Sequence, residues 1–427
     1  MNLSPARAAA FDVLVRMERH RAFSSVLLPE FEANLAERDR ALCHQLVMGV
    51  LRRKLFLDAL IDKYSGGRKL DIEVRTALEI GLLQIRELDR IPDHSAVNES
   101  VSLVQRAKKT SAKGLVNALL RRAIREDAEP EFADATESVA VRSSHPKWLI
   151  ERWGKEFGSE RAELIAKANN IPPRPAFRLT AKGLALPADH SDREGSSISK
   201  GGFVVERMTP ELRGRAERGE IYFQDEASQL VAESVRLEAG ERFLDVCAAP
   251  GSKTTMIAAA DPSNVLVAGD VSAARVEFLR QNCLRQGVGN VRVVRYDAEA
   301  ELPFEASSFD FVLLDAPCTG TGTIRSNPEI RYFLDPADPL RMQDKQLAML
   351  RNASKVVRPG GRLVYSTCSL EIEENEDVIA AFVADSPEFK AVRPDIPERF
   401  VTDRGFGRTF PDRDAADGFF IAKLVRG

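Results

Sequence analysis

The stretch that decides the fold is Phe243-Leu244-Asp245-Val246-Cys247-Ala248-Ala249-Pro250-Gly251-Ser252-Lys253-Thr254-Thr255. An apolar run passes into small residues and a Pro-Gly turn, after which a helix is expected to begin. Small side chains let a ligand approach the backbone, and free amides at a helix N-terminus favour an anionic group. The stretch is neither Gly-x-Gly-x-x-Gly nor Gly-x-x-x-x-Gly-Lys-Ser/Thr. It predicts either a ligand-binding turn or an ordinary tight turn between a strand and a helix.

The residues around this stretch, from 216 to 427, alternate between apolar runs rich in Val, Leu and Phe and helical segments. Such alternation predicts a Rossmann-like α/β domain, a mostly parallel doubly wound sheet that binds ligands at the carboxyl ends of its strands. The expected strands are Arg242–Cys247, Val265–Val271, Val291–Tyr296, Phe309–Asp315, Arg362–Ser366 and Phe419–Val425.

Acidic residues end three successive strands of this predicted sheet. Asp270 lies 19 residues after Gly251, at a strand tip where a carboxylate accepts hydrogen bonds from ribose hydroxyls. Asp297 closes the third strand, where the adenine end of such a ligand would lie, and Asp315 closes the fourth. A single acid at a strand end is usually a turn former, but three in succession indicate a binding edge for a nucleoside.

Two of the five cysteines follow strands of the same predicted sheet. Five cysteines in a chain of this length argue against a disulfide framework and for a reducing cytosol. Cys318 lies in the loop after the fourth strand and Cys368 in the loop after the fifth, so both should emerge at the ligand edge. A thiol is only a few per cent ionised at neutral pH, and Lys253 is a nearby source of positive potential.

The other three cysteines fit a plainer role, since a free cysteine is more often a small buried residue than a nucleophile. We expect Cys43 and Cys283 in the core, because they fall on apolar helical faces, and Cys247 as a lining residue of the first loop.

The first 127 residues predict an all-helical bundle. Ser4-Pro5 is typical of a helix start, and apolar residues recur at spacings of three and four without a strand pattern. Residues 128–140 are poor in large apolar side chains and are expected to form a linker. Residues 141–215 contain the extended runs Ala176–Thr180 and Phe203–Glu206 and predict a small α+β module.

The formal net charge of −3 is unevenly distributed along the chain. Residues 1–127 hold 22 Lys and Arg against 17 Asp and Glu, a balance of +5, whereas the remaining 300 residues hold 39 against 47, a balance of −8. This split indicates domains with separate functions, although an ordinary solvated surface would give the same counts. No window approaches the roughly 18 apolar residues of a membrane span.

Three segments around the cysteines resemble one enzyme family. Asp245–Lys253, Asp315–Thr323 and Thr367-Cys368-Ser369 followed by Glu371–Asn375 are similar to the signature of the Nol1/Nop2/Sun family of RNA cytosine-C5 methyltransferases. The segments of the N-terminal half that resemble the antitermination factor NusB are Leu46–Arg52, His94–Glu99 and Lys113–Arg122. The combination is similar to bacterial Sun/RsmB-type ribosomal RNA methyltransferases over nearly the whole chain.

Two departures from the family pattern concern RNA fit and edge packing. Phe177-Arg178-Leu179-Thr180 stands where relatives more often have Leu-Arg-Val-Asn, and Pro411 is followed by Asp412 where His or Asn is expected.

The resemblance implies a class I methyltransferase domain that uses S-adenosylmethionine, preceded by a module like an RNA-recognition fold. Asp270 would hold the cofactor ribose and Asp297 would lie at its adenine. The residues that would surround the methionine part of the cofactor are Cys247, Ala248, Ala249, Pro250, Gly251, Ser252 and Lys253.

The resemblance also implies a catalytic role for both cysteines. Cys368 would be the nucleophile that adds to C6 of cytosine, and Cys318 would assist removal of the C5 proton and release of the enzyme. Asp315, with Lys253 beside it, would contact both the cofactor and the target base. Thiolate addition at C6 is needed because C5 of cytosine is itself a poor nucleophile.

The expected substrate is the small-subunit 16S ribosomal RNA, by resemblance at cytosine 967. The same chemistry on tRNA remains an alternative, as does a non-catalytic RNA-binding or antitermination factor, although such a factor has no use for both Cys318 and Cys368. A DNA cytosine methyltransferase fits less well, because the second cysteine motif is not expected there. We expect a cytoplasmic monomer that uses no metal and binds no membrane.

Overall fold

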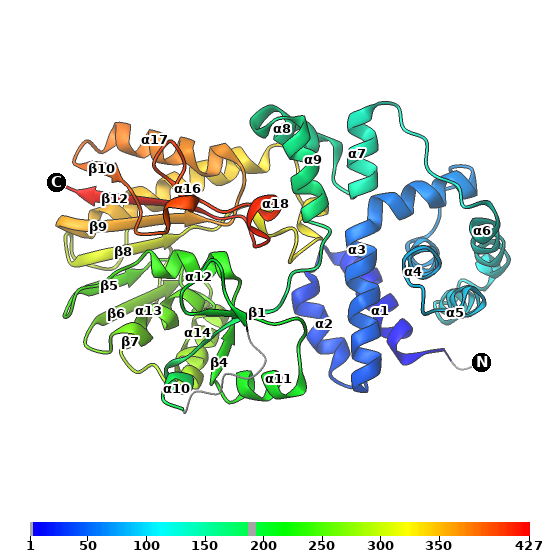
Figure 1. Cartoon of the computed structure of the whole chain (residues 1–427), viewed down its shortest axis with the longest axis horizontal. Coiled ribbons are helices and arrows are strands. Elements are labelled where there is room, and N and C mark those ends of the chain that lie inside the picture. Colours follow the sequence, from blue (N-terminus) through cyan, green and yellow to red (C-terminus); the bar gives the residue numbers. More distant parts are fainter. Residues whose placement is uncertain (1–2, 187–193) are drawn as a thin grey trace. The chain divides into compact units, whose positions relative to one another are not determined.

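The computed structural model describes residues 3–186 and 194–427, and its internal contacts divide the chain into two units (Figure 1). The helical unit runs to Ile171 and also includes Asn327–Leu334. The sheet unit comprises Pro172–Ser326 and Asp335–Gly427. None of the helices in the described ranges is both long enough and apolar enough to cross a membrane.

The helical unit confirms the all-helical prediction for the first 127 residues. The apolar residues that recur at spacings of three and four, among them Leu46, Val97 and Val116, are buried together in one core. The helices of this unit are α1 (Pro5–His20), α2 (Ser24–Glu32), α3 (Glu37–Ser65), α4 (Ile72–Glu87), α5 (Asp93–Arg106), the 3₁₀ turn η1 (Thr110–Ala112), α6 (Lys113–Glu126), α7 (Ala135–Ser143), α8 (Lys147–Phe157), α9 (Ser159–Ala168) and α15 (Ile330–Phe333).

The contacts divide the chain differently from the predicted domain boundaries. Part of the expected linker, residues 128–140, is helical, because the side chain of Asp134 caps α7 by accepting a hydrogen bond from the backbone of Glu137 at 2.7 Å. Helices α8 and α9, which the sequence assigned to the α+β module, pack in the helical unit and bury Trp153 and Ile165. Helix α7 was not predicted because it is short and has few large apolar residues, so its sequence gives little periodic signal.

A segment from the second half of the chain, Asn327–Leu334, completes the helical unit. The buried carboxylate of Glu329 accepts hydrogen bonds from both the backbone nitrogen and the hydroxyl of Ser24, each at 2.7 Å. The hydroxyl of Tyr332 donates to the carbonyl oxygen of Leu51 at 2.7 Å. The helical unit is therefore not built from the N-terminal sequence alone.

The sheet unit begins with a small antiparallel sheet in the order β2-β3-β1-β4. Its strands β1 and β3 confirm the two extended runs expected in the α+β module, and Phe177 is buried against Phe203 and Phe223. The elements of this part are β1 (Ala176–Leu179), α10 (Ala181–Leu184), β2 (Glu194–Gly195), β3 (Gly202–Val204), α11 (Pro210–Glu217) and β4 (Ile221–Phe223).

The main sheet confirms the Rossmann-like prediction. Its strands follow the order β10-β12-β9-β8-β5-β6-β7, with β11 paired to β12. Strands β5 to β9 run parallel to one another, whereas β12 pairs antiparallel with β9 and β10 pairs antiparallel with β12. The strands are β5 (Arg242–Asp245), β6 (Val265–Asp270), β7 (Val291–Arg295), β8 (Phe309–Asp315), β9 (Val357–Thr367), β10 (Phe389–Val392), β11 (Gly407–Arg408) and β12 (Phe420–Arg426).

Helices cover both faces of this sheet, α12, α13 and α14 on one face and α16 and α17 on the other (Figure 1). Alternate residues of one strand enter different cores: Phe311 and Leu313 pack on the first face, and Val312 and Leu314 on the second. The helices are α12 (Glu226–Glu233), α13 (Ser252–Ala260), α14 (Ala273–Gln286), η2 (Thr321–Thr323), α16 (Asp338–Lys355), η3 (Ile372–Glu374), α17 (Glu376–Asp385), η4 (Glu398–Phe400) and α18 (Pro411–Asp414).

A buried arginine joins the small sheet to the helix that follows the deciding stretch. The guanidinium of Arg178 in β1 donates to the hydroxyl of Thr255 at 2.8 Å and to the carbonyl oxygen of Ser252 at 2.9 Å. It also donates to the side-chain oxygen of Gln286 in α14 at 3.1 Å. Burial lowers the pKa of Arg178 to about 10. The start of α13 is thus held by the small sheet as well as by its own turn.

A buried histidine should make the stability of the helical unit sensitive to acid. The His145 ring is fully buried, and the tautomer that satisfies its partners donates from Nδ1 to the carbonyl oxygen of Ser143 at 2.8 Å and accepts at Nε2 from Asn169 at 3.2 Å. The guanidinium of Arg331 lies 3.1 Å from Nδ1. Burial, reinforced by this neighbouring positive charge, holds the pKa of His145 well below its ordinary value.

We predict that the helical unit loses stability as the pH falls below about 6.5, the ordinary pKa of histidine, because unfolding lets His145 take up a proton that the folded state refuses. The free energy of unfolding should fall by about 1.4 kcal/mol per pH unit in this range. Both tryptophans, Trp148 and Trp153, lie in α8, so tryptophan fluorescence in urea titrations reports on this unit.

The variant His145→Gln should flatten this pH dependence, whereas the control His20→Gln, at an exposed position, should retain it. An equally steep loss of stability in the His145→Gln protein would show that the buried ring is not its cause.

Candidate active site

A cavity of about 430 Å³ lies at the carboxyl edge of the parallel strands. The residues predicted from the sequence that line it are Cys247, Ala249, Asp270, Asp297, Asp315, Cys318 and Cys368. The ends of β5, β6, β7, β8 and β9 each contribute to it, as expected for a doubly wound sheet. The structure therefore brings the acids of three strands and both loop cysteines to one site.

The other residues of the turn between β5 and α13 are not part of the cavity wall. Ala248, Pro250, Gly251, Ser252 and Lys253 do not line the cavity, although all lie within the described chain. Gly251 adopts a φ of +97°, and a Cβ added there would lie 2.5 Å from the Leu279 side chain. Only glycine suits this position, both in backbone conformation and in space. The turn is thus compact enough to start α13 directly behind the cavity.

The acidic wall of the cavity is held in place by local bonds. One carboxylate oxygen of Asp270 accepts from the backbone of Ser272 at 3.1 Å, and the other pairs with Arg275 at 3.2 Å. Arg275 also donates to the carbonyl oxygen of Ala249 at 2.8 Å, which links α14 to the first loop. The carboxylate of Asp270 is almost fully buried, so its orientation is fixed.

The two cysteines meet because β8 and β9 are parallel neighbours with Asp315 opposite Ser366. The loops that continue from these strands bring the sulfur of Cys318 to 2.9 Å from the sulfur of Cys368. This separation exceeds the roughly 2.05 Å of a disulfide bond, and both thiols are free. The backbone nitrogen of Cys368 also donates to the sulfur of Cys318 at 3.3 Å.

A glycine allows this close approach. The backbone nitrogen of Gly322 donates to the carbonyl oxygen of Cys368 at 2.9 Å, and its carbonyl oxygen accepts from Gly418 at 2.8 Å. A Cβ at position 322 would lie 2.0 Å from the carbonyl oxygen of Gly418. The small residues after Cys318 therefore serve to pack three backbone segments together.

Lys253 reaches the site from α13 through an ion pair. Its ammonium group lies 2.6 Å from one carboxylate oxygen of Asp315, and the other oxygen accepts from the hydroxyl of Ser366 at 2.6 Å. Burial acts to lower the pKa of Lys253, but the Asp315 carboxylate and Cys368 outweigh it, so the pKa lies above its ordinary value. Lys253 is therefore a positive charge in the site, held by Asp315.

The other thiol is held in its protonated form. The pKa of Cys318 lies well above its ordinary value, first because of its hydrogen bond with Cys368, then because of burial and the neighbouring charges of Cys368 and Glu374. Burial likewise raises the pKa of Cys247. Cys43 and Cys283 are buried in helical cores, which confirms their predicted structural role.

Several residues at the site carried no recognised signal in the sequence. Arg275, Lys345 and Met349 line the cavity from α14 and α16, and Tyr296 lines it from the end of β7. The position of Tyr296 directly before Asp297, at the end of an expected strand, is a signal that could have identified it; for the three residues on helices, the orientation of the helix is not given by the sequence.

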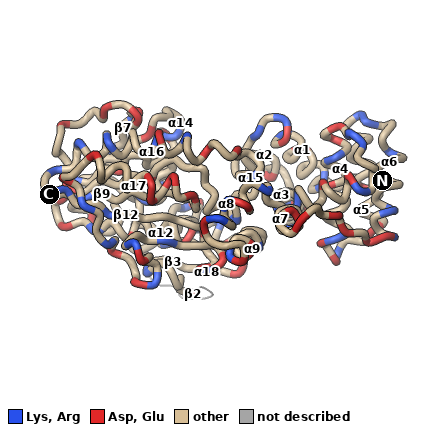
Figure 2. The backbone as a smooth tube through the Cα atoms, turned by 90° about the horizontal axis from the view of Figure 1, so that it is seen from above, with Lys and Arg blue, Asp and Glu red and all other residues tan. Residues whose placement is uncertain are grey.

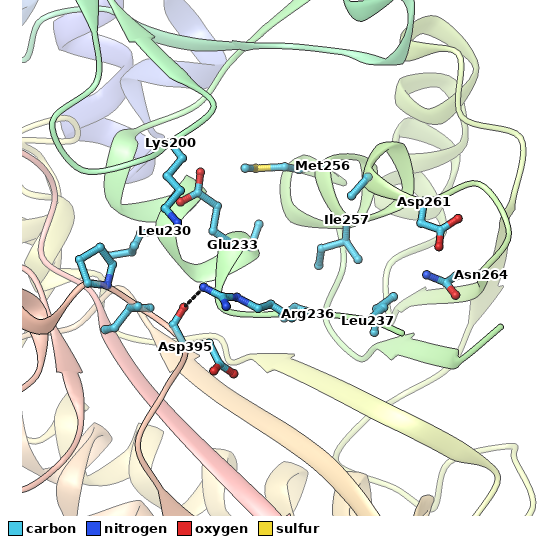
Figure 3. A pocket seen from close by; sticks show the side chains of 15 residues that line it. Lys200, Leu230, Glu233, Arg236, Leu237, Met256, Ile257, Asp261, Asn264 and Asp395 are labelled. Carbon is cyan, nitrogen blue, oxygen red and sulfur yellow. Dashed lines mark hydrogen bonds between the residues drawn. The ribbon is translucent and has the colours of Figure 1, made fainter. Parts of the chain in front are cut away.

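A larger cavity of about 870 Å³ in the sheet unit lies elsewhere (Figure 3). It is lined by Glu233 of α12, Ile257 of α13 and Asn264, which precedes β6, and so faces the amino ends of the strands. Arg236 reaches across it to the carbonyl oxygen of Asp395 at 3.5 Å. The predicted site residues, all of which the structure describes, do not line this cavity.

Two family models match separate parts of the chain. Residues 4–125 match the NusB family, and residues 232–425 match the 16S rRNA methyltransferase RsmB/F model. These matches correspond to the helical bundle and to the parallel sheet that carries the cavity.

Relatives match from end to end. The chain is 32% identical to a probable ribosomal RNA small subunit methyltransferase B of Bacillus subtilis, over 99% of both chains. It is 35% identical to the ribosomal RNA small subunit methyltransferase B of Thermus thermophilus, over 100% of this chain and 99% of that one.

A solved structure, PH0851, has the same fold with a TM-score of 0.84 at 24% identity, over 99% of both chains. A methyltransferase homologue from Pyrococcus horikoshii is 28% identical with a TM-score of 0.57, over 69% of this chain and all of that one. The chain therefore belongs to the RsmB/F family of S-adenosylmethionine-dependent ribosomal RNA small subunit methyltransferases.

Proposed function

We propose that this methyltransferase modifies C5 of a cytosine in 16S ribosomal RNA through a covalent adduct between Cys368 and C6 of the base, by resemblance at cytosine 967. The observation that carries the proposal is the pair of thiols, 2.9 Å apart, beside an acidic cavity. Methyl transfer to a nucleophilic base atom needs no thiol, whereas C5 becomes nucleophilic only after addition at C6. The expected location is the cytoplasm.

The cavity fits S-adenosylmethionine in its donor set. A sulfonium cation is favoured by nearby carboxylates, and Asp270, Asp297 and Asp315 supply them from three strand ends. Asp270 would hold the ribose hydroxyls, and Asp297 would lie at the adenine. The cofactor supplies an electrophilic methyl group when bound. The small residues Cys247 and Ala249 let the methionine part approach the backbone.

Cys368 begins the reaction as the nucleophile, and the ammonium of Lys253 is a nearby source of positive potential. Its sulfur bonds to C6 of the target cytosine, and the electrons of the C5–C6 double bond make C5 nucleophilic. C5 forms its bond to the methyl carbon, and the C5 proton then leaves to a base. The electrons of the C5–H bond restore the double bond as the C6–S bond breaks, and Cys318 assists this release.

Cysteine substitutions test this assignment of roles. Cys368→Ala should reduce transfer of labelled methyl groups to 16S ribosomal RNA at least about 1,000-fold, since the nucleophile is lost. Cys318→Ala should instead accumulate a covalent protein–RNA complex that survives denaturing electrophoresis. The control Cys283→Ala, in the core of α14, should methylate at the normal rate. An adduct that persists without Cys368 would contradict the assignment.

The helical unit offers basic side chains for RNA phosphates. Arg38 and Arg90 are exposed, line a cavity of about 890 Å³ together with Arg7, and have no hydrogen-bond or ion-pair partner among the described residues. Figure 2 shows basic and acidic residues interspersed along this unit, so arginines that lack an acidic partner are the ones available to RNA.

We predict that replacing both Arg38 and Arg90 by Ala weakens RNA binding. The plot of log K against log salt concentration should become less steep by about 1.4, which is roughly 0.7 for each phosphate contact on single-stranded RNA. The matched control replaces Arg16 and Arg122, which already pair with Glu30 and Glu126. Filter binding at several salt concentrations measures the slope, and an unchanged slope in the first variant would exclude this surface.

A further inference from the structure

We propose that Glu374 is a positioning residue, whose buried carboxylate ties the two cysteine loops together and makes the two thiols chemically unequal. This inference rests on the proposed roles of Cys318 and Cys368, and it concerns a residue outside the cofactor cavity. Glu374 ends the 3₁₀ turn η3, and its side chain is fully buried.

The carboxylate of Glu374 binds the residue that follows each cysteine. Its Oε2 accepts from the backbone nitrogen of Thr319 at 2.8 Å, and its Oε1 accepts from the Thr319 hydroxyl. The same Oε1 accepts from the hydroxyl of Ser369 at 2.6 Å. One carboxylate therefore bridges the loop of Cys318 and the loop of Cys368.

A glutamine extends this bridge to the other side of Cys318. The amide nitrogen of Gln346 in α16 donates to Oε2 of Glu374 at 2.9 Å and to the carbonyl oxygen of Pro317 at 2.9 Å. The hydroxyl of Tyr365 in β9 donates to the backbone oxygen of Glu374 at 2.6 Å. Cys318 is thus held on both sides, by Pro317 and by Thr319.

The buried carboxylate of Glu374 has no cationic partner among the described residues. In the part of the chain that the structure describes, no Lys, Arg or His forms an ion pair with it. Burial raises the pKa of Glu374, while hydrogen bonds from Ser369, Thr319 and Gln346 oppose this shift. All of these partners are donors, which is the arrangement that an ionised carboxylate requires.

Glu374 makes more hydrogen bonds to the loop of Cys318 than to the loop of Cys368. Glu374 is also among the causes that raise the pKa of Cys318, and its partner Gln346 binds the carbonyl oxygen of Pro317, the residue before Cys318. The other titratable groups around the pair are Tyr365 of β9, Asp315 of β8 and Lys345 of α16, which pairs with Glu299. The two sulfurs therefore differ in their surroundings, because the buried carboxylate is bound mainly to the loop of Cys318.

A Cys318 that keeps its proton is a hydrogen-bond donor to the sulfur of Cys368. In the final step the C6–S bond breaks, its electron pair stays on the sulfur of Cys368, and the C5 proton passes to water. A donor 2.9 Å away stabilises the departing thiolate, whereas a deprotonated Cys318 would repel it. Glu374 thereby favours release of the methylated base.

Two substitutions of Glu374 separate its charge from its position. In Glu374→Gln the amide oxygen can accept from the Thr319 nitrogen and Gln346, and the amide nitrogen can donate to the two hydroxyls after these rotate. Geometry is then retained without the charge. Glu374→Ala removes both the charge and the hydrogen bonds. If this variant does not fold, the double variant Thr319→Val/Ser369→Ala takes its place, since it removes only the hydrogen bonds from the two hydroxyls.

The charge is tested by the pH dependence of Cys318 alkylation by iodoacetamide, followed by peptide mass spectrometry in a Cys368→Ala background. The midpoint should fall by about one pH unit in Glu374→Gln, the effect that one nearby charge exerts. It should not move in the control Asp377→Asn, an exposed carboxylate of α17. A midpoint that stays in place in Glu374→Gln overturns the electrostatic role.

The positioning role is tested by turnover with both cysteines present. Glu374→Ala, or the Thr319→Val/Ser369→Ala protein, should lower kcat about 100-fold while KM for RNA changes little, because misplaced reacting groups cost about this much. An unchanged kcat overturns the positioning role. The alkylation measurement needs neither RNA nor methyl transfer, so it remains decisive even if the wild-type protein methylates no cytosine.

Discussion

The parallel pairing of β8 with β9 is the constraint on which the site depends. Because Asp315 lies opposite Ser366, the chain leaves both strands at the same height and the next loops run side by side. A register shift of one residue would reverse the direction of every side chain on the strand and separate the two sulfurs. The distance of 2.9 Å between Cys318 and Cys368 is thus set by backbone hydrogen bonds in the core of the sheet.

The ionisable side chains buried at the carboxyl edge of the sheet lower the stability of the fold, and we propose that they support the reaction. Asp315 with Lys253 and the isolated carboxylate of Glu374 lie where apolar residues would pack with less desolvation. Glu374 is among the groups that raise the pKa of Cys318, and Lys253 is held in the site by its ion pair with Asp315. The site is held by polar bonds between loops, and the apolar cores on the two faces of the sheet support the strands beneath it.

Much of this arrangement could be predicted from the sequence, because strand ends are local features. Asp270, Asp297 and Asp315 close apolar runs, and the rule that parallel strands bind ligands at their carboxyl ends places them together. Gln346 and Arg275 could not be found in this way, and the sequence marks Glu374 only as part of the segment Glu371–Asn375 that resembles the family signature, without a role. Their contribution depends on how α14, α16 and η3 rotate against the sheet, which the apolar pattern of each helix determines only coarsely.

The division of the chain was hidden for a related reason. Glu329 and Arg331 follow the Cys318 loop in sequence, yet they are buried among residues of the helical unit. A segment of only eight residues, 327–334, is too short to show a period from which its partner can be inferred. Similarly, α7 begins inside a stretch whose composition is typical of a linker, because a single Asp134 cap and a few small residues are enough to form it.

The central claim, that this methyltransferase acts on C5 of a cytosine, is tested most directly by bisulfite sequencing of 16S ribosomal RNA. RNA from a strain that lacks the gene is compared with RNA from the same strain carrying either the wild-type gene or the Cys368→Ala variant. The account predicts one cytosine that resists conversion only when the wild-type gene is present. The same resistant cytosines in all three strains would contradict it.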